Sequence, residues 1–337
     1  MKKFAFYLSV AVCMLLALPS CKKEGKSVFT PTSSGRPYEV LVVMDKNMWE
    51  APTGRALYNV LDRDVPGLPQ SERSFRISQI PTDRMVRSFK IFRNIIMADI
   101  QPIYTQPKMK YSRNTYSVPQ MILTIQAPDT ASFASFVEKN GQTIIDFFTK
   151  TEMNRQINQL KEEHNPVIST KVGSIFGCDV MVPMEVQKYK QGKDFIWAST
   201  DRANADMNFV MYSYPYTDKN TFTKEYFIHK RDSVMKINLP GASEGMYMTT
   251  APNTSSVSRT VYNNKSILVV KGLWEMENDA MGGPFITHSI VDSANNRVIT
   301  AEAFIYGPGE KKRDRMRRLE AALYTLNKLK DNKPANK

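Results

Sequence analysis

The chain has 337 residues, of which 42% are hydrophobic and 23% are charged. This composition excludes wholesale disorder, collagen-like repetition and a disulfide-stapled miniprotein, and the length suits one large domain or two modest ones. The 46 Lys and Arg residues outnumber the 33 Asp and Glu residues, which gives a formal net charge of +13.

The N-terminus has the pattern of a secretory signal. A cationic start, Met1-Lys2-Lys3, is followed by an uncharged, mostly apolar run over residues 4–18. This run is too short to cross a bilayer, which needs about 20 helical residues. Leu18-Pro19-Ser20-Cys21 resembles a bacterial lipobox, whose cysteine is acylated with chains such as palmitate. We therefore predict a signal peptide over residues 1–20 and lipidation at Cys21; the alternative is an ordinary signal peptide cut elsewhere.

The cysteines and the residues after Cys21 predict the compartment. Cys13 falls in the removed segment and Cys21 carries the lipid, so we predict no disulfide within the mature chain. Lys22, where an inner-membrane protein commonly has Asp, favours the outer membrane, with a periplasmic or a surface-facing domain. Residues 21–36 are predicted as a lipidated flexible tether that holds the protein at the membrane.

The first half of the chain alternates strand and helix patterns. A β-branched run over residues 38–44 predicts a buried strand, and residues 45–61 read as a helical region that Pro52 interrupts. Residues 65–70 and 101–118 are connections, the second a long one or a ragged hairpin. Further strands are predicted over 74–80, 92–100 and 120–127, and a helical stretch over 131–163, broken near 140–141.

The second half is richer in strands, predicted over 178–187, 195–200, 207–214, 257–261, 266–276, 285–291 and 298–306. Helices are predicted over 222–236 and 310–329. Hairpins outnumber strand–helix alternation, which predicts an α+β fold with mainly antiparallel sheets and helices packed on one face. The predicted division is two similar α+β lobes, 37–165 and 166–330, and a disordered tail over 331–337.

Several short motifs carry a family resemblance. They are Leu68-Pro69-Gln70, the segment 245–250, Gly272-Leu273-Trp274, the segment 281–285 and Lys312-Arg313. Together they resemble a family of Gram-negative envelope lipoproteins described as domain of unknown function 4837, over nearly all of residues 36–330. The resemblance implies an envelope setting and carries over no catalytic residues.

The stretch around Trp274 is the foremost candidate for ligand recognition. If its strand continues, Glu275, Glu277 and Asp279 share one face, and three carboxylates could bind Ca²⁺. The EF-hand pattern fails, however, and a solvated strand end is the alternative. The glycines of the following turn, Gly282 and Gly283, would let a ligand come close to the tryptophan.

Two further patches are weaker candidates. Tyr212 and Tyr214 lie on one strand face, which could stack on a ligand or could be a half-buried sheet edge. A run of cations follows Gly307-Pro308-Gly309 at a predicted helix N-terminus, where an anion would fit. The alternative is a solvated charged face. The candidate anion-binding residues are Lys311, Lys312, Arg313 and Arg315.

No motif predicts catalysis. The segment 241–245 matches G-x-S-x-G but follows a helix and precedes a strand, the reverse of a nucleophile elbow. Cys178 has apolar neighbours, and the three histidines lack ligand spacing. We predict no catalytic residue, metal or cofactor.

The sequence thus predicts an outer-membrane lipoprotein that binds an envelope protein, glycan or anionic lipid, and no nucleic acid. An envelope hydrolase with an unadvertised active site is the alternative, and a structural subunit of a larger complex is a third class.

Overall fold

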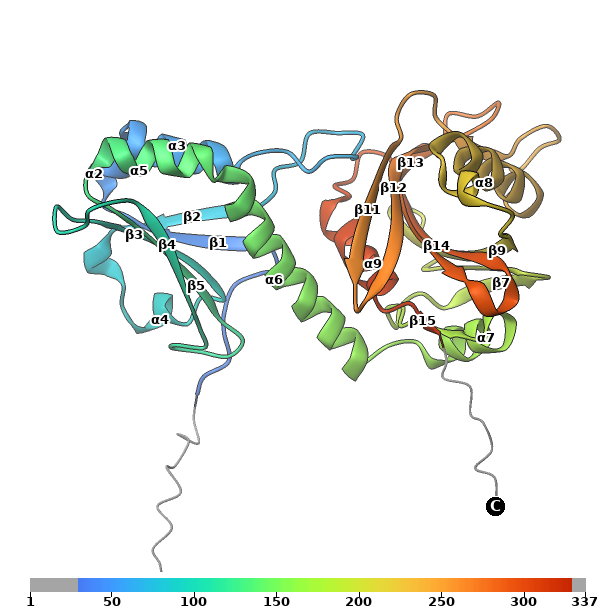
Figure 1. Ribbon diagram of the computed structural model, residues 1–337, viewed down its shortest axis with the longest axis horizontal. Helices are drawn as coiled ribbons and strands as arrows, with labels where there is room; N and C mark the ends of the chain where they lie inside the picture. Colours follow the sequence, from blue (N-terminus) through green and yellow to red (C-terminus); the bar gives the residue numbers. More distant parts are fainter. Residues whose placement is uncertain (1–29, 329–337) are drawn as a thin grey trace, which may run out of the picture.

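The computed structural model describes residues 30–328, which form two lobes with separate sheets (Figure 1). The N-terminal lobe has a five-stranded sheet of order β2-β1-β3-β5-β4. The C-terminal lobe has an eight-stranded antiparallel sheet, in which β11 lies beside β12 and the order is otherwise β10-β12-β13-β14-β9-β8-β7. The α+β class predicted from the sequence is confirmed.

The N-terminal sheet is mixed rather than antiparallel. Its strands are β1 (Glu39–Val43), β2 (Arg76–Ile80), β3 (Asn94–Ile100), β4 (Lys108–Arg113) and β5 (Met121–Ala127). The pairs β1–β2, β1–β3 and β3–β5 are parallel, and β4 runs antiparallel to β5. Parallel neighbours need crossover connections, and α2 (Lys46–Glu50) with α3 (Pro52–Leu61) supplies the one between β1 and β2.

Helices cover one face of this sheet and a short segment covers the other. The helical face carries α3, α5 (Thr130–Lys139) and α6 (Gly141–Glu162), and the break predicted near 140–141 is confirmed. Asp129 accepts a hydrogen bond from Ser132 N and so caps α5. On the opposite face, a 3₁₀ turn (Thr82–Arg84) and α4 (Arg87–Lys90) bring partly buried side chains such as Phe89 against the strands.

The C-terminal lobe begins at α7 (Pro166–Phe176). Its remaining elements are β6 (Cys178–Asp179), β7 (Lys188–Gly192), β8 (Phe195–Ser199), β9 (Asp206–Pro215), a 3₁₀ turn (Lys219–Phe222), α8 (Lys224–Asn238), β10 (Met248–Thr250), β11 (Ser256–Tyr262), β12 (Lys265–Met276), β13 (Gly282–Asp292), a 3₁₀ turn (Ser293–Asn295), β14 (Arg297–Tyr306), α9 (Arg313–Tyr324) and β15 (Asn327–Lys328).

Two predicted elements of this lobe are wrong in extent. The strand predicted over 178–187 is limited to Cys178–Asp179. The chain after it turns at residues 184–185 and buries Val180, Val182 and Val186 in the core without belonging to a strand. The last helix, predicted to reach residue 329, ends at Tyr324 because the chain turns there and β15 pairs with β6.

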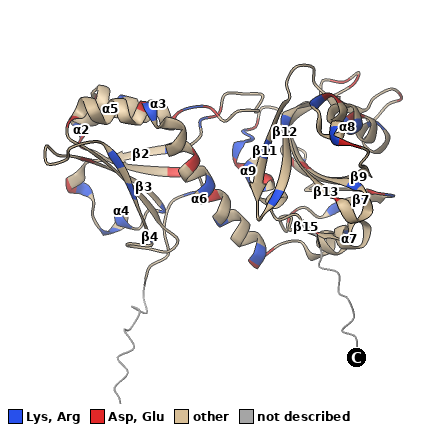
Figure 2. Ribbon diagram, in the orientation of Figure 1, with Lys and Arg blue, Asp and Glu red and all other residues tan. Residues whose placement is uncertain are grey.

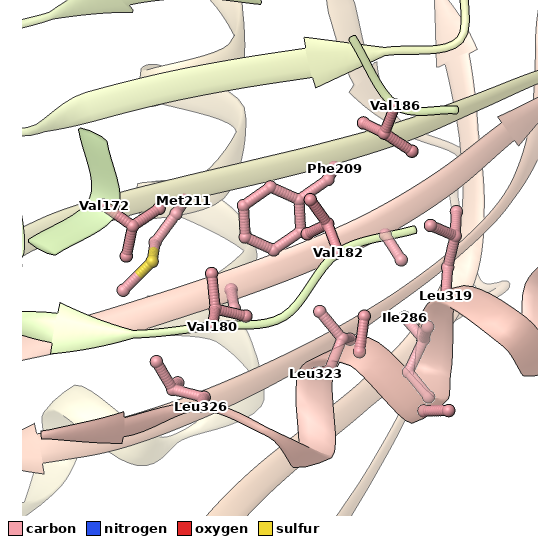
Figure 3. Close-up of a cluster of buried hydrophobic side chains, with 14 of the residues drawn as sticks. Val172, Val180, Val182, Val186, Phe209, Met211, Ile286, Leu319, Leu323 and Leu326 are labelled. Atoms are coloured by element: carbon pink, nitrogen blue, oxygen red, sulfur yellow. The ribbon is translucent and has the colours of Figure 1, made fainter. Parts of the chain in front are cut away.

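Helices pack on both faces of the C-terminal sheet, so the prediction that they cover one face only is wrong for this lobe. The strands carry apolar residues on both sides, so each face needs a cover. One face packs against α6, α7 and α9, and Figure 3 shows Val180, Val182 and Leu323 meeting Phe209 in this core. The other face packs against α8.

The expected tether is partly anchored. Cys21 and residues 1–20 lie outside the described residues, as does the predicted tail 331–337. Residues 31–34, however, are hydrogen-bonded to the N-terminal lobe: Ser34 N donates to Ile91 O at 2.8 Å and Val118 N donates to Pro31 O at 2.9 Å. Among residues 30–328, no helix has the length and apolar character needed to cross a membrane.

Candidate functional site at the lobe interface

The first turn of α9 is capped by a carboxylate from the other lobe. Glu72, in the loop before β2, accepts hydrogen bonds from Lys312 N at 2.7 Å and from Arg313 N at 3.1 Å. A helix N-terminus has unpaired N–H groups and a partial positive charge, so a carboxylate there is stabilising. Glu72 is 7% exposed, and its charge is therefore committed to this internal contact.

Two arginines of α9 extend the contact along the same loop. Arg313 Nη1 donates to Arg73 O at 2.6 Å and Arg317 Nη1 donates to Ser74 O at 2.8 Å. The Arg317 guanidinium also lies 4.0 Å from the centroid of the Tyr38 ring. Burial lowers the pKa of Arg317 from its ordinary value. We call Glu72, Arg313, Arg317 and Tyr38 the interlobe clamp.

Tyr38 has an uncommon backbone conformation. Its φ is 57°, in the left-handed region that bulky side chains rarely adopt. The ring is fully buried beneath Arg317. Such conformations persist where the surroundings over-determine them, so the clamp contact fixes the entry of the chain into β1.

A cleft of about 530 Å³ lies beside the clamp. Its walls come from both lobes: α6 and the loop near Pro66 on one side, β11, β12 and α9 on the other (Figure 1). This volume is in the range of small-molecule sites. Its lining includes Asn154, Val261, Tyr262, Lys271 and Glu320.

The cleft combines an ion pair, aromatic rings and an exposed aliphatic group. Lys271 Nζ lies 3.1 Å from Glu320 Oε1, and the rings of Tyr262 and Tyr324 are 5.0 Å apart. Burial raises the pKa of Tyr324 to about 12, so its phenol is neutral at neutral pH. Val261 is 73% exposed. This arrangement can bind a molecule that has an apolar body and polar groups to hydrogen-bond.

A buried histidine lies behind this aromatic pair. The His288 ring is 4.5 Å from that of Tyr324, edge to face, and the side chain is fully buried. Burial lowers the pKa of His288 to about 4. The imidazole is therefore neutral at physiological pH and supports Tyr324 rather than facing solvent.

The stretch predicted around Trp274 is partly buried and partly at the surface. Trp274 is 2% exposed, and its Nε1–H donates to Ile305 O at 3.3 Å. A Cβ on Gly283 would lie 2.1 Å from the same oxygen, so this glycine permits close strand packing rather than close approach of a ligand. The predicted access to the tryptophan ring is thus corrected.

The three carboxylates of this stretch do not share a strand face. The strand β12 ends at Met276, so Glu275 lies in it while Glu277 and Asp279 lie in the following turn. Asp279 and Gly282 line a separate hollow of about 430 Å³ together with segments 69–70 and 306–309. Among the described residues, no group of three or more His, Cys, Asp or Glu is placed to hold a metal ion.

The tyrosine row on β9 is covered by a helix. Tyr212 and Tyr214 are 1% and 7% exposed, and their rings stack at 6.2 Å. Tyr226 of α8 lies 6.4 Å from Tyr214. The row belongs to the core between the sheet and α8, so these rings offer little surface to a ligand.

The predicted anion-binding residues divide between buried and exposed positions. Lys312 and Arg313 are 4% and 6% exposed, whereas Lys311 and Arg315 remain accessible to solvent. The anion expected at this helix N-terminus is the protein's own Glu72 carboxylate. An external anion at the backbone N–H groups of Lys312 and Arg313 would have to displace it. Anion binding at the accessible Lys311 and Arg315 stays a prediction.

The structure does not support a nucleophilic role for Ser243 or Cys178. Ser243 follows α8 and precedes β10, the reverse of the order in a nucleophile elbow. Cys178 is fully buried. No local sequence pattern indicates the roles of Glu72, Arg317 or the Lys271–Glu320 pair, because the partners of these residues lie far away in the chain.

Two family models match adjoining parts of the chain. Residues 165–325 match a domain of unknown function (DUF4837), and residues 33–161 match another domain of unknown function (DUF8532). The resemblance to the first family, expected over nearly the whole chain, is thus shown for the C-terminal lobe, while the N-terminal lobe matches the second. No curated protein matches the chain.

Two solved structures of Mog1 show distant similarity. The Saccharomyces cerevisiae Ran-binding protein Mog1p has 10% sequence identity, covers 45% of this chain and 90% of its own, and has a TM-score of 0.28. A Mog1 mutant has 11% identity, covers 46% of this chain and 92% of its own, and has a TM-score of 0.29. Scores this low support no argument about fold or function.

Proposed function

We propose that the protein is a lipid-anchored outer-membrane protein that binds an envelope partner or ligand in the cleft between its lobes. The anchorage rests on the signal-like N-terminus and on the lipobox-like segment that ends at Cys21. Binding rests on one structural observation: both lobes contribute exposed apolar and polar side chains to a cleft of about 530 Å³.

The clamp supports binding because it holds the cleft walls in place. Glu72 and Ser74, from the N-terminal lobe, bond to α9, and α9 also carries Glu320 and Tyr324 of the cleft. A binding site whose walls are positioned in advance loses less conformational entropy when the ligand arrives. Val261 adds an apolar side chain that is 73% exposed at the cleft, where a partner would cover it.

Site-specific photocrosslinking in intact cells tests the binding proposal. A photoreactive amino acid at Val261 should give a discrete adduct. The same amino acid at Ile237, which is 77% exposed at the end of α8, is the matched control. Asn154→Trp, an exposed change on the α6 wall, should fill the cleft and abolish the Val261 adduct. Identical adducts at both positions, or an adduct that survives Asn154→Trp, would refute binding in the cleft.

The anchorage has an independent test. Metabolic labelling with a fatty-acid analogue should label the protein, and Cys21→Ser should abolish both the label and partitioning into detergent. A Cys21→Ser protein that is processed and partitions unchanged would show that the lipid anchor is not there.

A further inference from the structure

We propose that the surface around the exit of the N-terminal segment rests on the anionic headgroups of the bilayer. This inference deepens the proposed anchorage and rests on it. The surface consists of Arg84, Val86, Arg87, Lys90, Tyr116 and Val118, and we call it the exit patch.

Three segments of the N-terminal lobe are bonded together at this place. Arg93 N donates to Ser34 O at 2.9 Å, and Ser33 N donates to Val118 O at 3.0 Å. Ser117 Oγ donates to Ile91 O at 3.1 Å. The segment that leads back to Cys21 therefore leaves the fold between the loop that holds Val118 and the segment just after α4, at the lower edge of the lobe in Figure 1.

The distance from the lipid to this surface is limited. Nine residues, 22–30, separate Cys21 from Pro31, the first residue with a hydrogen bond to the loop. A fully extended chain of that length spans at most about 35 Å, and a coil spans roughly 15–20 Å. An acylated Cys21 would thus keep the exit patch within reach of the headgroups.

The chemistry of the exit patch suits an anionic interface. Residues 84–93 and 113–120 contain no Asp or Glu, and Figure 2 shows Lys and Arg on α4. Val86, Val118 and Tyr116 are 53%, 43% and 38% exposed, and Lys90 Nζ lies 5.4 Å from the centroid of the Tyr116 ring. Cations with exposed aliphatic and tyrosine side chains are typical of segments that lie in a membrane interface.

The acid nearest in sequence does not neutralise the patch. Asp83 lies 3.9 Å from Arg84, and both side chains are more than 70% exposed, at 77% and 75%. Such a pair is screened by solvent. Arg87 and Lys90 have no acidic residue within the same segment. A second exposed carboxylate lies at the same turn, because Asp45 Oδ1 accepts a hydrogen bond from Thr82 N at 3.4 Å. The positive potential of the patch therefore comes mainly from Arg87 and Lys90.

Vesicle binding of the unacylated chain tests the proposal. Residues 22–337 keep every residue that the structure describes. This chain should cosediment with vesicles of equal parts phosphatidylglycerol and phosphatidylcholine, but not with phosphatidylcholine alone, and high salt should release it. The triple variant Arg84→Glu, Arg87→Glu, Lys90→Glu should bind at least about tenfold more weakly.

A second triple variant separates the patch from overall charge. Lys190→Glu, Lys193→Glu, Lys219→Glu makes the same change in net charge on exposed positions of the other lobe, and should change binding by less than about twofold. Equal losses in both triples, or no binding of the parent chain to anionic vesicles, would overturn the proposal. The chain carries no lipid, so a failed acylation test at Cys21 would leave this result unchanged.

Discussion

Removing the Glu72 carboxylate should uncouple the two lobes. In Glu72→Ala, Lys312 N and Arg313 N lose an acceptor at 2.7 and 3.1 Å, in a place where the side chain is 7% exposed. Hydrogen bonds to charged groups contribute about 1.5–3 kcal/mol net, and N-caps about 0.5–2 kcal/mol. These two energies describe partly the same hydrogen bonds and are not simply added. We therefore expect a loss of about 2–4 kcal/mol in the free energy of unfolding.

The assay is urea unfolding followed by tryptophan fluorescence. Trp49 reports on the N-terminal lobe, and Trp197 and Trp274 report on the C-terminal lobe. In the parent protein the signals should change together. In Glu72→Ala the transition should begin at lower urea and separate into two steps, because the interface between the lobes loses its capping carboxylate and keeps only contacts such as Arg313 to Arg73 O and Arg317 to Ser74 O.

Two variants make the result decisive. Glu72→Gln keeps an acceptor without the charge, so its loss should lie between those of the parent and Glu72→Ala. Glu310→Gln removes an exposed carboxylate close by, 3.9 Å from Arg315, and should change stability by no more than about 0.5 kcal/mol. If Glu72→Ala unfolds like Glu310→Gln, the cap does not stabilise the interface and the clamp reasoning is refuted.

Three further changes test other parts of the fold by chemical denaturation. Arg231 Nη2 lies 2.7 Å from Glu302 Oε1 in the C-terminal lobe, and both side chains are fully buried. Arg231→Met should cost about 3–5 kcal/mol because it leaves Glu302 buried and unpaired, whereas combining it with Glu302→Leu should restore much of the loss. Gly283→Ala should cost at least about 2 kcal/mol, since its Cβ would lie 2.1 Å from Ile305 O. The folded-state pKa of His288 is lowered from 6.5 to about 4, so the unfolded state takes up its proton first as pH falls. Stability should therefore fall between those two pH values, by up to about 3 kcal/mol, and a His288→Gln variant should lack this loss.

The sequence predicts elements well where apolar side chains form continuous runs. The strand β1 lies within the β-branched run that predicts it. The break between α5 and α6 also lies at the residues 140–141 where the sequence places it. The strand β7 (Lys188–Gly192) is missed, and β4 (Lys108–Arg113) falls in the segment for which the sequence leaves a long connection and a ragged hairpin both open. Both are exposed edge strands of polar composition. Backbone pairing with a neighbour holds them there, and no local pattern records it.

The interface site could not be predicted from local patterns. Glu72 and Lys312 are 240 residues apart, and nothing in either neighbourhood indicates the other. The basic run did point to an anion at the start of α9, because cations and helix N–H groups both favour one. The sequence did not indicate that the anion is the Glu72 carboxylate, because only the packing of the two lobes brings that side chain to the helix.

The spacing of the cations in α9 explains which of them turn inward. Arg313 and Arg317 are four residues apart and flank Met316, on the stripe that is buried against both lobes. Lys311, Arg315 and Arg318 repeat on the opposite side and stay accessible. A cation that shares a stripe with core residues must find an internal acceptor, because its burial is otherwise too costly. By contrast, the cations of the exit patch lie on a turn and a four-residue helix. Within residues 30–328, Arg84 has only the exposed carboxylate of Asp83 beside it, and Arg87 and Lys90 have no acidic partner, which leaves these cations available to a surface outside the protein.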